Sequence, residues 1–212
     1  HHTTLLAEAV QPADVIVEAI IEQLQPKRTL WTQIDALAKN TALFGSNTSS
    51  IPIAQLATAV TAPERFIGLH FFNPPALVPL LEIVVAPETS EATVARSKTF
   101  GERLQRKLVV VKDSPGFATS RLGVVLALEA IRMIEAGVAS AADIDTAMEV
   151  GYGHAMGPLR TTDLVGLDVR LAIAETLHQT LGGAHYEPPA LLRRLVQEGK
   201  LGKKAKQGFY AW

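Results

Sequence analysis

The sequence has 212 residues, of which 48% are hydrophobic and 19% charged, a composition typical of a globular protein and not of a disordered one. Its formal net charge of -1 argues against a nucleic-acid-binding surface, which needs clustered lysines and arginines. Cysteine is absent, so disulfides, thiolate catalysis and zinc–thiolate sites are excluded.

The sequence shows no clear sign of a membrane span, a secretory leader or a metal site. No apolar run approaches the roughly 18 residues that a membrane span requires, so we predict no membrane partner. The sequence does not begin with a basic segment and an apolar core, and we therefore expect no secretory leader and a cytoplasmic location. The adjacent His1 and His2 are a poor metal site because the other histidines are scattered, and we expect no metal.

The first half of the chain alternates between short apolar runs and helical patterns. Helical patterns precede Pro12, begin near Pro26, cover residues 53–59 and run from Thr89 or Ser90 to about Gln105. Between them, strands are predicted over residues 14–20, 42–45, 66–72, 80–85 and 108–111. This alternation predicts a mostly parallel sheet with helices on both faces, with the valine-rich last run as a buried strand. Ligands of such sheets bind at the carboxyl ends of the strands.

Beyond Asp113 nearly every segment is helical in pattern. A turn at Ser114-Pro115-Gly116 leads into a long helix over residues 117–136, which Gly137 ends in a left-handed conformation. Ser140 begins a capping box, glycines interrupt residues 151–158, and helices follow over residues 167–181 and 189–198. We expect the aromatic residues of Gly208-Phe209-Tyr210 to dock on the core. The sequence therefore predicts two domains, residues 1–112 and 113–212.

A dinucleotide-binding fold begins with a strand, a Gly-x-Gly-x-x-Gly loop and a helix that holds the pyrophosphate. No such loop precedes Asp14. The fold class is therefore predicted as α/β, a partial Rossmann-like doubly wound sheet whose first strands are missing, followed by an all-α C-terminal domain. We expect the chain to be truncated and impaired in NAD binding.

Polar residues that could form a site follow one predicted strand and interrupt two others. Ser46-Asn47-Thr48-Ser49-Ser50 follows the second strand, where Ser49 or Ser50 could equally cap the next helix. His70 lies near the end of the third strand and Glu82 inside the fourth, each within an apolar run. A lone histidine there is more often a core residue, but a buried carboxylate without a partner is costly. The sequence therefore predicts that His70 and Glu82 pair.

A histidine–glutamate pair is suited to general base catalysis. Glu82 would orient the imidazole and stabilise its protonated form, while His70 accepts the proton of a substrate hydroxyl. Beside a nicotinamide, loss of that proton lets the carbinol carbon release a hydride. Ser49 and Asn73 could bind the substrate oxygen or the carboxamide.

Six motifs occur in order: Val17-Glu18-Ala19-Ile20, Ser46-Asn47-Thr48-Ser49-Ser50, His70-Phe71-Phe72-Asn73-Pro74, Lys112-Asp113-Ser114-Pro115-Gly116-Phe117, Gly157-Pro158 and Gly208-Phe209-Tyr210. With them the chain resembles the 3-hydroxyacyl-CoA dehydrogenase family over essentially its whole length. The resemblance implies an oxidoreductase of fatty-acid β-oxidation that uses NAD to oxidise the L-3-hydroxyl of an acyl-CoA. It also implies a homodimer formed through the helical domain.

The resemblance also implies roles for individual residues. His70 matches the catalytic base, Glu82 its partner, and Ser49 the serine that contacts substrate and cofactor. Further cofactor contacts are implied for Glu22, Lys27, Asn73 and Lys204. From the residues alone, Lys27 and Lys204 would be solvated surface charges. Ser120 stands where the family usually has asparagine. Serine keeps a hydroxyl but is the shorter side chain, so we expect the contact to the substrate or to His70 to be lost or bridged by water.

Two alternatives remain open. Asn73-Pro74-Pro75 is similar to relatives that oxidise a small hydroxy acid of the carnitine or sugar-acid type. The absent glycine loop and Ser120 would also suit a non-enzymatic dimeric module. In the long helix, Val124, Val125, Leu128, Ile131 and Ile134 could cover both the core and a partner subunit, or be buried within one subunit.

Overall fold

The computed structural model describes residues 2–212, and His1 of the predicted histidine pair lies outside them. The chain forms two compact units, one ending at Phe117 and the other covering Ala118–Trp212. In the described residues no helix has the length and apolar character needed to cross a bilayer.

The first unit contains a five-stranded sheet with the order β1-β2-β3-β4-β5. Its strands are β1 (Val15–Glu18), β2 (Leu43–Ser46), β3 (Phe66–Phe71), β4 (Leu80–Val85) and β5 (Lys107–Lys112). Neighbouring strands are parallel except β3 and β4, which are antiparallel. The mostly parallel sheet is confirmed, but the antiparallel pair was not predicted. The connection over residues 72–79 is too short for the crossover that parallel strands need.

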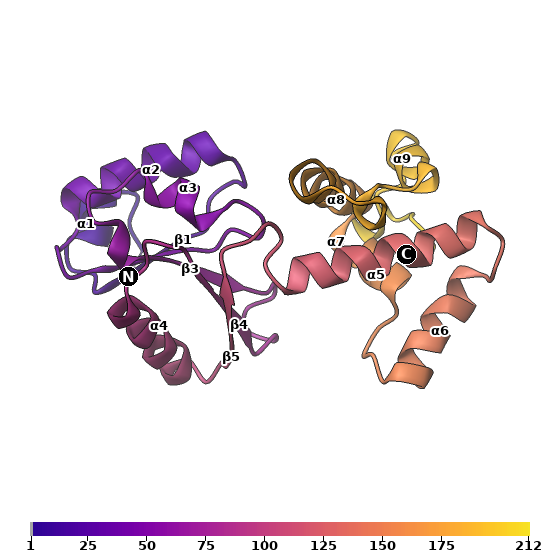
Figure 1. The fold of residues 1–212 in the computed structure, drawn as a ribbon, viewed down its shortest axis with the longest axis horizontal. Helices are drawn as coiled ribbons and strands as arrows, with labels where there is room; N and C mark the ends of the chain where they lie inside the picture. The colour runs from indigo at the N-terminus through magenta and orange to yellow at the C-terminus, as the bar shows by residue number, and fades with distance from the viewer. Residues whose placement is uncertain (1) are drawn as a thin grey trace. The chain divides into compact units, whose positions relative to one another are not determined.

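Helices cover both faces of this sheet, as predicted. These are α1 (Leu6–Val10), α2 (Leu24–Leu37), α3 (Ile53–Ala57) and α4 (Glu91–Arg103). Figure 1 shows α2 and α3 on one face and α4 on the other. Of the two residues predicted to cap α4, Ser90 is the cap, because its hydroxyl accepts from the amide of Thr93 at 3.2 Å.

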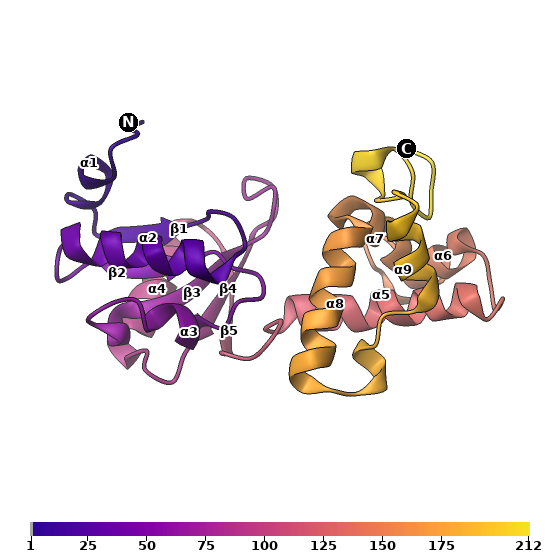
Figure 2. The same ribbon diagram turned by 90° about the horizontal axis from the view of Figure 1, so that it is seen from above.

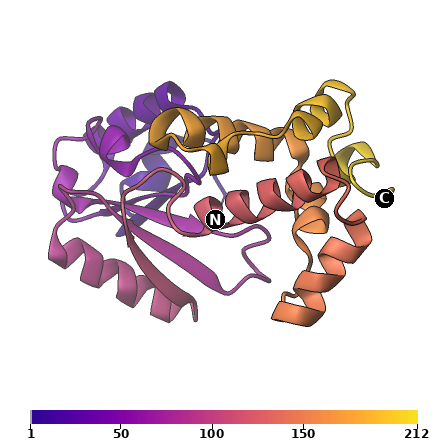
Figure 3. The ribbon, with the colours of Figure 1, turned by 45° about the vertical axis from the view of Figure 1, so that its right-hand side comes forward.

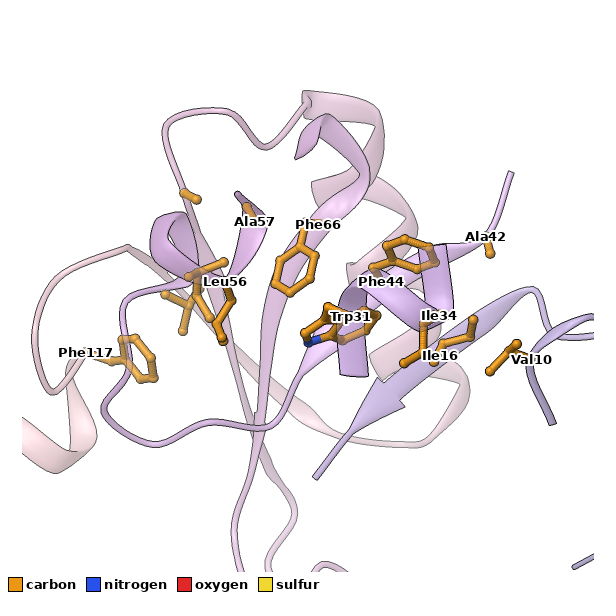
Figure 4. Packing of buried hydrophobic residues seen from close by; sticks show 13 residues of the cluster. Val10, Ile16, Trp31, Ile34, Ala42, Phe44, Leu56, Ala57, Phe66 and Phe117 are labelled. Atoms are coloured by element: carbon orange, nitrogen blue, oxygen red, sulfur yellow. The ribbon is translucent and has the colours of Figure 1, made fainter. Parts of the chain in front are cut away.

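The core under α2 is aromatic. Trp31 lies with its ring centroid 4.7 Å from that of Phe66 and 5.1 Å from that of Phe44 (Figure 4). Ile34 of α2 is buried beside Trp31, whereas Leu30 and Leu37 of the same helix are only partly buried. On the other face, Leu43, Ile67, Leu69, Leu81 and Ile83 pack against α4.

Strand β5 is not the buried strand that its valines predicted. Val109 is 37% exposed and Val110 44% exposed. The reason is topological, because β5 is the last strand in the sheet order and has only β4 beside it. Leu108 is partly covered by the residues around α4.

The second unit is helical, as predicted. It contains α5 (Thr119–Glu135), α6 (Ala141–Tyr152), α7 (Pro158–Val165), α8 (Leu167–Leu181) and α9 (Ala190–Gln197). Helices α8 and α9 cross α5 (Figures 2 and 3), and the buried core between them includes Val124, Leu128, Ile131, Leu177 and Leu192. Gly137 ends α5 with φ +65, and the amide of Val138 donates to the carbonyl of Met133, which confirms the predicted left-handed end.

Residues 151–158 differ from the predicted loop. Helix α6 continues through Gly151 to Tyr152 before Gly153 ends it in a left-handed conformation. Helix α7, which was not predicted, begins at Pro158. Its first turn is capped by the buried Asp145, whose carboxylate accepts from the amides of Leu159 at 2.8 Å and Arg160 at 2.9 Å. A cap from another helix leaves no local signal.

The C-terminal tail docks on this unit through a second buried carboxylate. Asp163 accepts from the amides of Phe209 and Tyr210, both at 2.9 Å, and from Nε1 of Trp212 at 2.8 Å. Phe209 and Tyr210 pack against the core, which confirms the predicted docking. A Cβ on Gly208 would lie 2.2 Å from Oδ1 of Asp163. The docked carboxylate therefore explains why a glycine occupies this position of the motif.

Candidate active site

Several buried polar residues of the first unit lie at the carboxyl ends of β1, β2 and β3. Strand pairing places Glu18 beside Ser46, and Ser46 beside Gly68. Residues paired in this way point to the same face of the sheet, and His70 follows Gly68 by two positions on that face. This is the edge at which mostly parallel sheets bind ligands.

His70 and Glu82 are partners in the antiparallel β3–β4 ladder. Both are buried, and Nδ1 of His70 lies 3.0 Å from Oε2 of Glu82. The predicted pairing of these two side chains is therefore present. Because directly opposed residues share a face, the strand register itself brings the two groups together.

The contact through Nδ1 fixes what the imidazole can do. When Nδ1 carries the proton that faces Glu82, Nε2 is the nitrogen that can accept another proton. The rings of Phe72 and Phe117 lie 4.5 Å and 5.9 Å from that of His70, between centroids. These rings shield the imidazole from water on those sides. The arrangement suits a general base that is oriented by a carboxylate.

The run Ser46–Ser50 is here called the serine turn. Hydrogen bonds to Thr48 around the turn and a hydrogen bond to β3 fix its conformation. Oγ1 of Thr48 accepts from the amides of Ser50 at 3.3 Å and Ile51 at 2.9 Å. Oδ1 of Asn47 accepts from the amide of Phe71, next to His70, at 2.7 Å. Asn47 and Thr48 were not predicted individually as positioning residues.

The alternative role of the serine turn as a helix cap is wrong. The N-cap of α3 is Pro52, which has no side-chain hydrogen bond to the helix, whereas Oδ2 of Asp113 accepts from the amide of Ala54 at 2.8 Å. In the described part of the chain, the hydroxyl of Ser49 has no hydrogen bond to a protein group. It is therefore available to a ligand.

Glu22 clamps the serine turn from the loop that follows β1. Its Oε1 accepts from the hydroxyl of Thr48 at 2.6 Å, the amides of Ser49 and Ser50 at 2.9 Å and 3.1 Å, and the hydroxyl of Ser50 at 3.1 Å. Burial opposes ionisation, but these hydrogen bonds and the charge of Lys27 hold the pKa of the Glu22 carboxyl below its usual range.

Lys27 is not the solvated surface charge that the residues alone predicted. It is 1% exposed, and its Nζ lies 2.6 Å from Oε1 of Glu18. The prediction failed because a lysine in an amphipathic helix is ordinarily solvated, whereas Lys27 has a buried acid within reach. Glu18 itself was missed, although a carboxylate at the end of an apolar strand is the same signal that identified Glu82.

Asn73, Ser120 and Lys204, the remaining predicted site residues, belong to other segments than the serine turn and its partners Glu22 and Lys27. Asn73 is exposed, beyond the end of β3. Ser120 lies in the first turn of α5, and the half-exposed Lys204 bonds Asp168 at 2.6 Å, both in the second unit. A hydrogen bond joins Glu22 to the amide of Ser49, and an ion pair of 3.4 Å joins Glu22 to Lys27, while the roles of all these residues stay predictions.

We expect the clamp at Glu22 to open only at strongly acidic pH. A carboxyl whose pKa is lowered on folding adds stability above its unfolded pKa and loses it as the pH falls through the folded value. The amides of Ser49 and Ser50 should therefore shift in an NMR titration with a midpoint below the usual glutamate range, and Glu22→Gln should abolish that transition. A midpoint at or above the usual range would contradict the clamp.

Comparison with known proteins agrees with this geometry. The family described as 3-hydroxyacyl-CoA dehydrogenase, NAD binding domain, matches residues 1–114, and the corresponding C-terminal domain matches residues 116–212. A 3-hydroxybutyryl-CoA dehydrogenase of Mycobacterium tuberculosis is 43% identical over 200 residues, covering 93% of this chain and 70% of that protein. The mitochondrial hydroxyacyl-coenzyme A dehydrogenase of Sus scrofa is 42% identical over 211 residues, covering 99% and 67% respectively.

A solved structure supports the same assignment. The crystal structure of (S)-3-hydroxybutyryl-CoA dehydrogenase PaaH1 from Ralstonia eutropha is similar with a TM-score of 0.95 at 35% identity, covering 99% of this chain and 74% of that one. Three findings that do not depend on the site geometry agree. Family models match both units, relatives are similar over almost the whole chain, and the fold is shared. The chain belongs to the 3-hydroxyacyl-CoA dehydrogenase family.

Proposed function

We propose that this chain carries out the NAD-dependent oxidation of the L-3-hydroxyl of a 3-hydroxyacyl-CoA to the 3-ketoacyl-CoA, and the reverse reduction. The observation that carries the proposal is the buried His70–Glu82 pair at the ligand-binding edge of the sheet. Nε2 of His70 would take the hydroxyl proton while the carbinol carbon loses a hydride, which leaves a carbonyl. Glu82 would stabilise the imidazolium that forms.

The chain's own residues fit the nicotinamide half of NAD. The Ser49 hydroxyl is free to bond a carboxamide or a substrate oxygen, and the Glu18, Lys27 and Glu22 side chains together carry a net negative charge that suits a cationic ring. When bound, NAD supplies the hydride acceptor. Asn73, Lys204 and Ser120 complete the proposed set of cofactor and substrate contacts.

The proposal also covers assembly and location. We assign cofactor binding to residues 1–112, and substrate binding and homodimer formation to residues 113–212. Leu122 on α5 is 71% exposed, and Val150 and Tyr152 at the end of α6 are also exposed, which supports a partner surface on this unit. A cytoplasmic location stays a prediction.

The first test is a titration of this chain with NADH followed by fluorescence, then turnover with acetoacetyl-CoA. We expect NADH binding and consumption, with an affinity below that of the homologous M. tuberculosis enzyme because NAD binding is expected to be impaired, and that enzyme is the positive control for both assays. Binding without turnover of any 3-ketoacyl-CoA would overturn the substrate assignment. Absence of both would favour the non-enzymatic dimeric module.

A small hydroxy acid is the second candidate substrate. Asn73-Pro74-Pro75 and the exposed Leu77 lie in the connection between β3 and β4, directly after the strand that carries His70. Oxidation of free hydroxy acids with a higher kcat/KM than that of 3-hydroxyacyl-CoAs would favour this candidate.

A further inference from the structure

A buried ion pair lies beneath the serine turn. Glu18 is the last residue of β1, and Lys27 lies in the first turns of α2, on the same face of the sheet. Oε1 of Glu18 accepts from Nζ of Lys27 at 2.6 Å and from the amide of Ile20 at 2.7 Å, and its Oε2 accepts from the hydroxyl of Ser46 at 2.7 Å. Both side chains are almost fully buried.

Most of the donor capacity of Lys27 is taken up by the protein. An ammonium group has three donors. Its Nζ lies 2.6 Å from Glu18, 3.1 Å from the carbonyl oxygen of Ile20 and 3.4 Å from Oε2 of Glu22. The first two contacts are hydrogen bonds, and the third is an ion pair. Lys27 can therefore act on the site through its protein partners.

Glu22 links this ion pair to Ser49. One oxygen of Glu22 faces Lys27, while the other accepts four hydrogen bonds from the serine turn. The short contact to Glu18 satisfies most of the charge of Lys27, so that Glu22 can remain on the serine turn at the longer distance. Without the charge of Glu18, the buried ammonium would draw Glu22 towards itself and away from the amides of Ser49 and Ser50.

We propose that Glu18 and Lys27 are positioning residues, whose buried ion pair holds Glu22 in place and through it fixes the turn that carries Ser49. The effect on ligand binding rests on the proposed function, whereas the effect on the turn does not. Stability alone does not explain the pair, because a buried ion pair seldom stabilises a fold more than apolar residues of similar size. Its location at the ligand-binding edge gives it a positional role.

The test is Glu18→Gln, which keeps the size of the side chain and removes its charge. Amide hydrogen exchange of Ser49 and Ser50 is measured by NMR well below the unfolding temperature, together with NADH affinity. We expect protection of both amides to fall about ten-fold or more, since hydrogen bonds to a charged acceptor are lost, and NADH affinity to fall with it. Protection in the strands of the first unit should stay unchanged.

Asp14→Asn is the matched control. It removes the charge from an exposed ion pair, in which Oδ1 of Asp14 lies 2.8 Å from Nζ of Lys39, just before the start of β1. We expect wild-type exchange of the Ser49 and Ser50 amides in this variant. Ser46→Ala is a milder second variant, which removes one hydrogen bond to Glu18 and should loosen the same two amides about three-fold or more even if Glu18→Gln does not fold.

The outcomes separate a positional role from a structural one. If Glu18→Gln, or Ser46→Ala in its place, lowers only the unfolding temperature while Ser49 and Ser50 keep wild-type protection, the proposal is overturned. If the amides of the serine turn lose protection, the positional role stands. A wild-type chain that binds no NADH would refute the proposed function, and amide exchange would still decide the role of the ion pair.

Discussion

Replacing His70 by glutamine is expected to lower kcat/KM for 3-hydroxyacyl-CoA oxidation by roughly 10²–10⁴-fold, the typical contribution of a general base. Glutamine has a similar length and can still donate a hydrogen bond to Glu82, so the buried carboxylate keeps a partner. It cannot accept a proton at neutral pH. The loss should therefore fall on the chemical step, and the unfolding temperature should change little.

Two companion variants make this result specific. His154→Gln changes an exposed histidine of the second unit and should leave turnover at the wild-type level. Glu82→Gln should give an intermediate loss, because it keeps an acceptor beside the imidazole but removes the charge that stabilises the imidazolium. If His70→Gln turned over at the wild-type rate in steady-state assays, His70 would not be the base.

The His70–Glu82 pair could be predicted because strand patterns carry it. Each residue interrupts an apolar run, and the cost of burying an unpaired carboxylate is enough by itself to predict a partner. The register that joins them comes from the antiparallel β3–β4 pair, which the sequence did not reveal. The pairing was therefore predictable, while the strand direction that produces the contact was not.

The supporting residues were harder to predict because their partners come from other elements. Lys27 fits the pattern of a solvated helix residue, and only the position of Glu18 on the neighbouring strand explains its burial. Helix α7 was missed for the same reason, since its cap is Asp145 of α6. Local sequence patterns indicate helix or strand propensity and periodicity, but they give no information about a polar partner that another element supplies.

Gly208→Ala is expected to lower the free energy of unfolding of the second unit by about 2–4 kcal/mol, through overpacking and lost hydrogen bonds. The added Cβ would lie 2.2 Å from Oδ1 of Asp163. That carboxylate cannot move aside cheaply, because it is buried and accepts hydrogen bonds from Phe209, Tyr210 and Trp212. Either the tail detaches or the carboxylate loses partners.

Gly151→Ala in the same unit is the matched substitution with the opposite expected sign. A Cβ at Gly151 would meet no heavy atom within 4 Å, and the residue lies in helix α6. Alanine there should therefore stabilise the unit by about 0.5–1 kcal/mol. Urea unfolding followed by circular dichroism measures both variants, and Gly208→Ala should also lower the thermal midpoint of this unit by about 10–25 °C. A Gly208→Ala variant as stable as wild type would show that the docked tail can move away from Asp163 at little cost, and the structural reason given for this glycine would then be wrong.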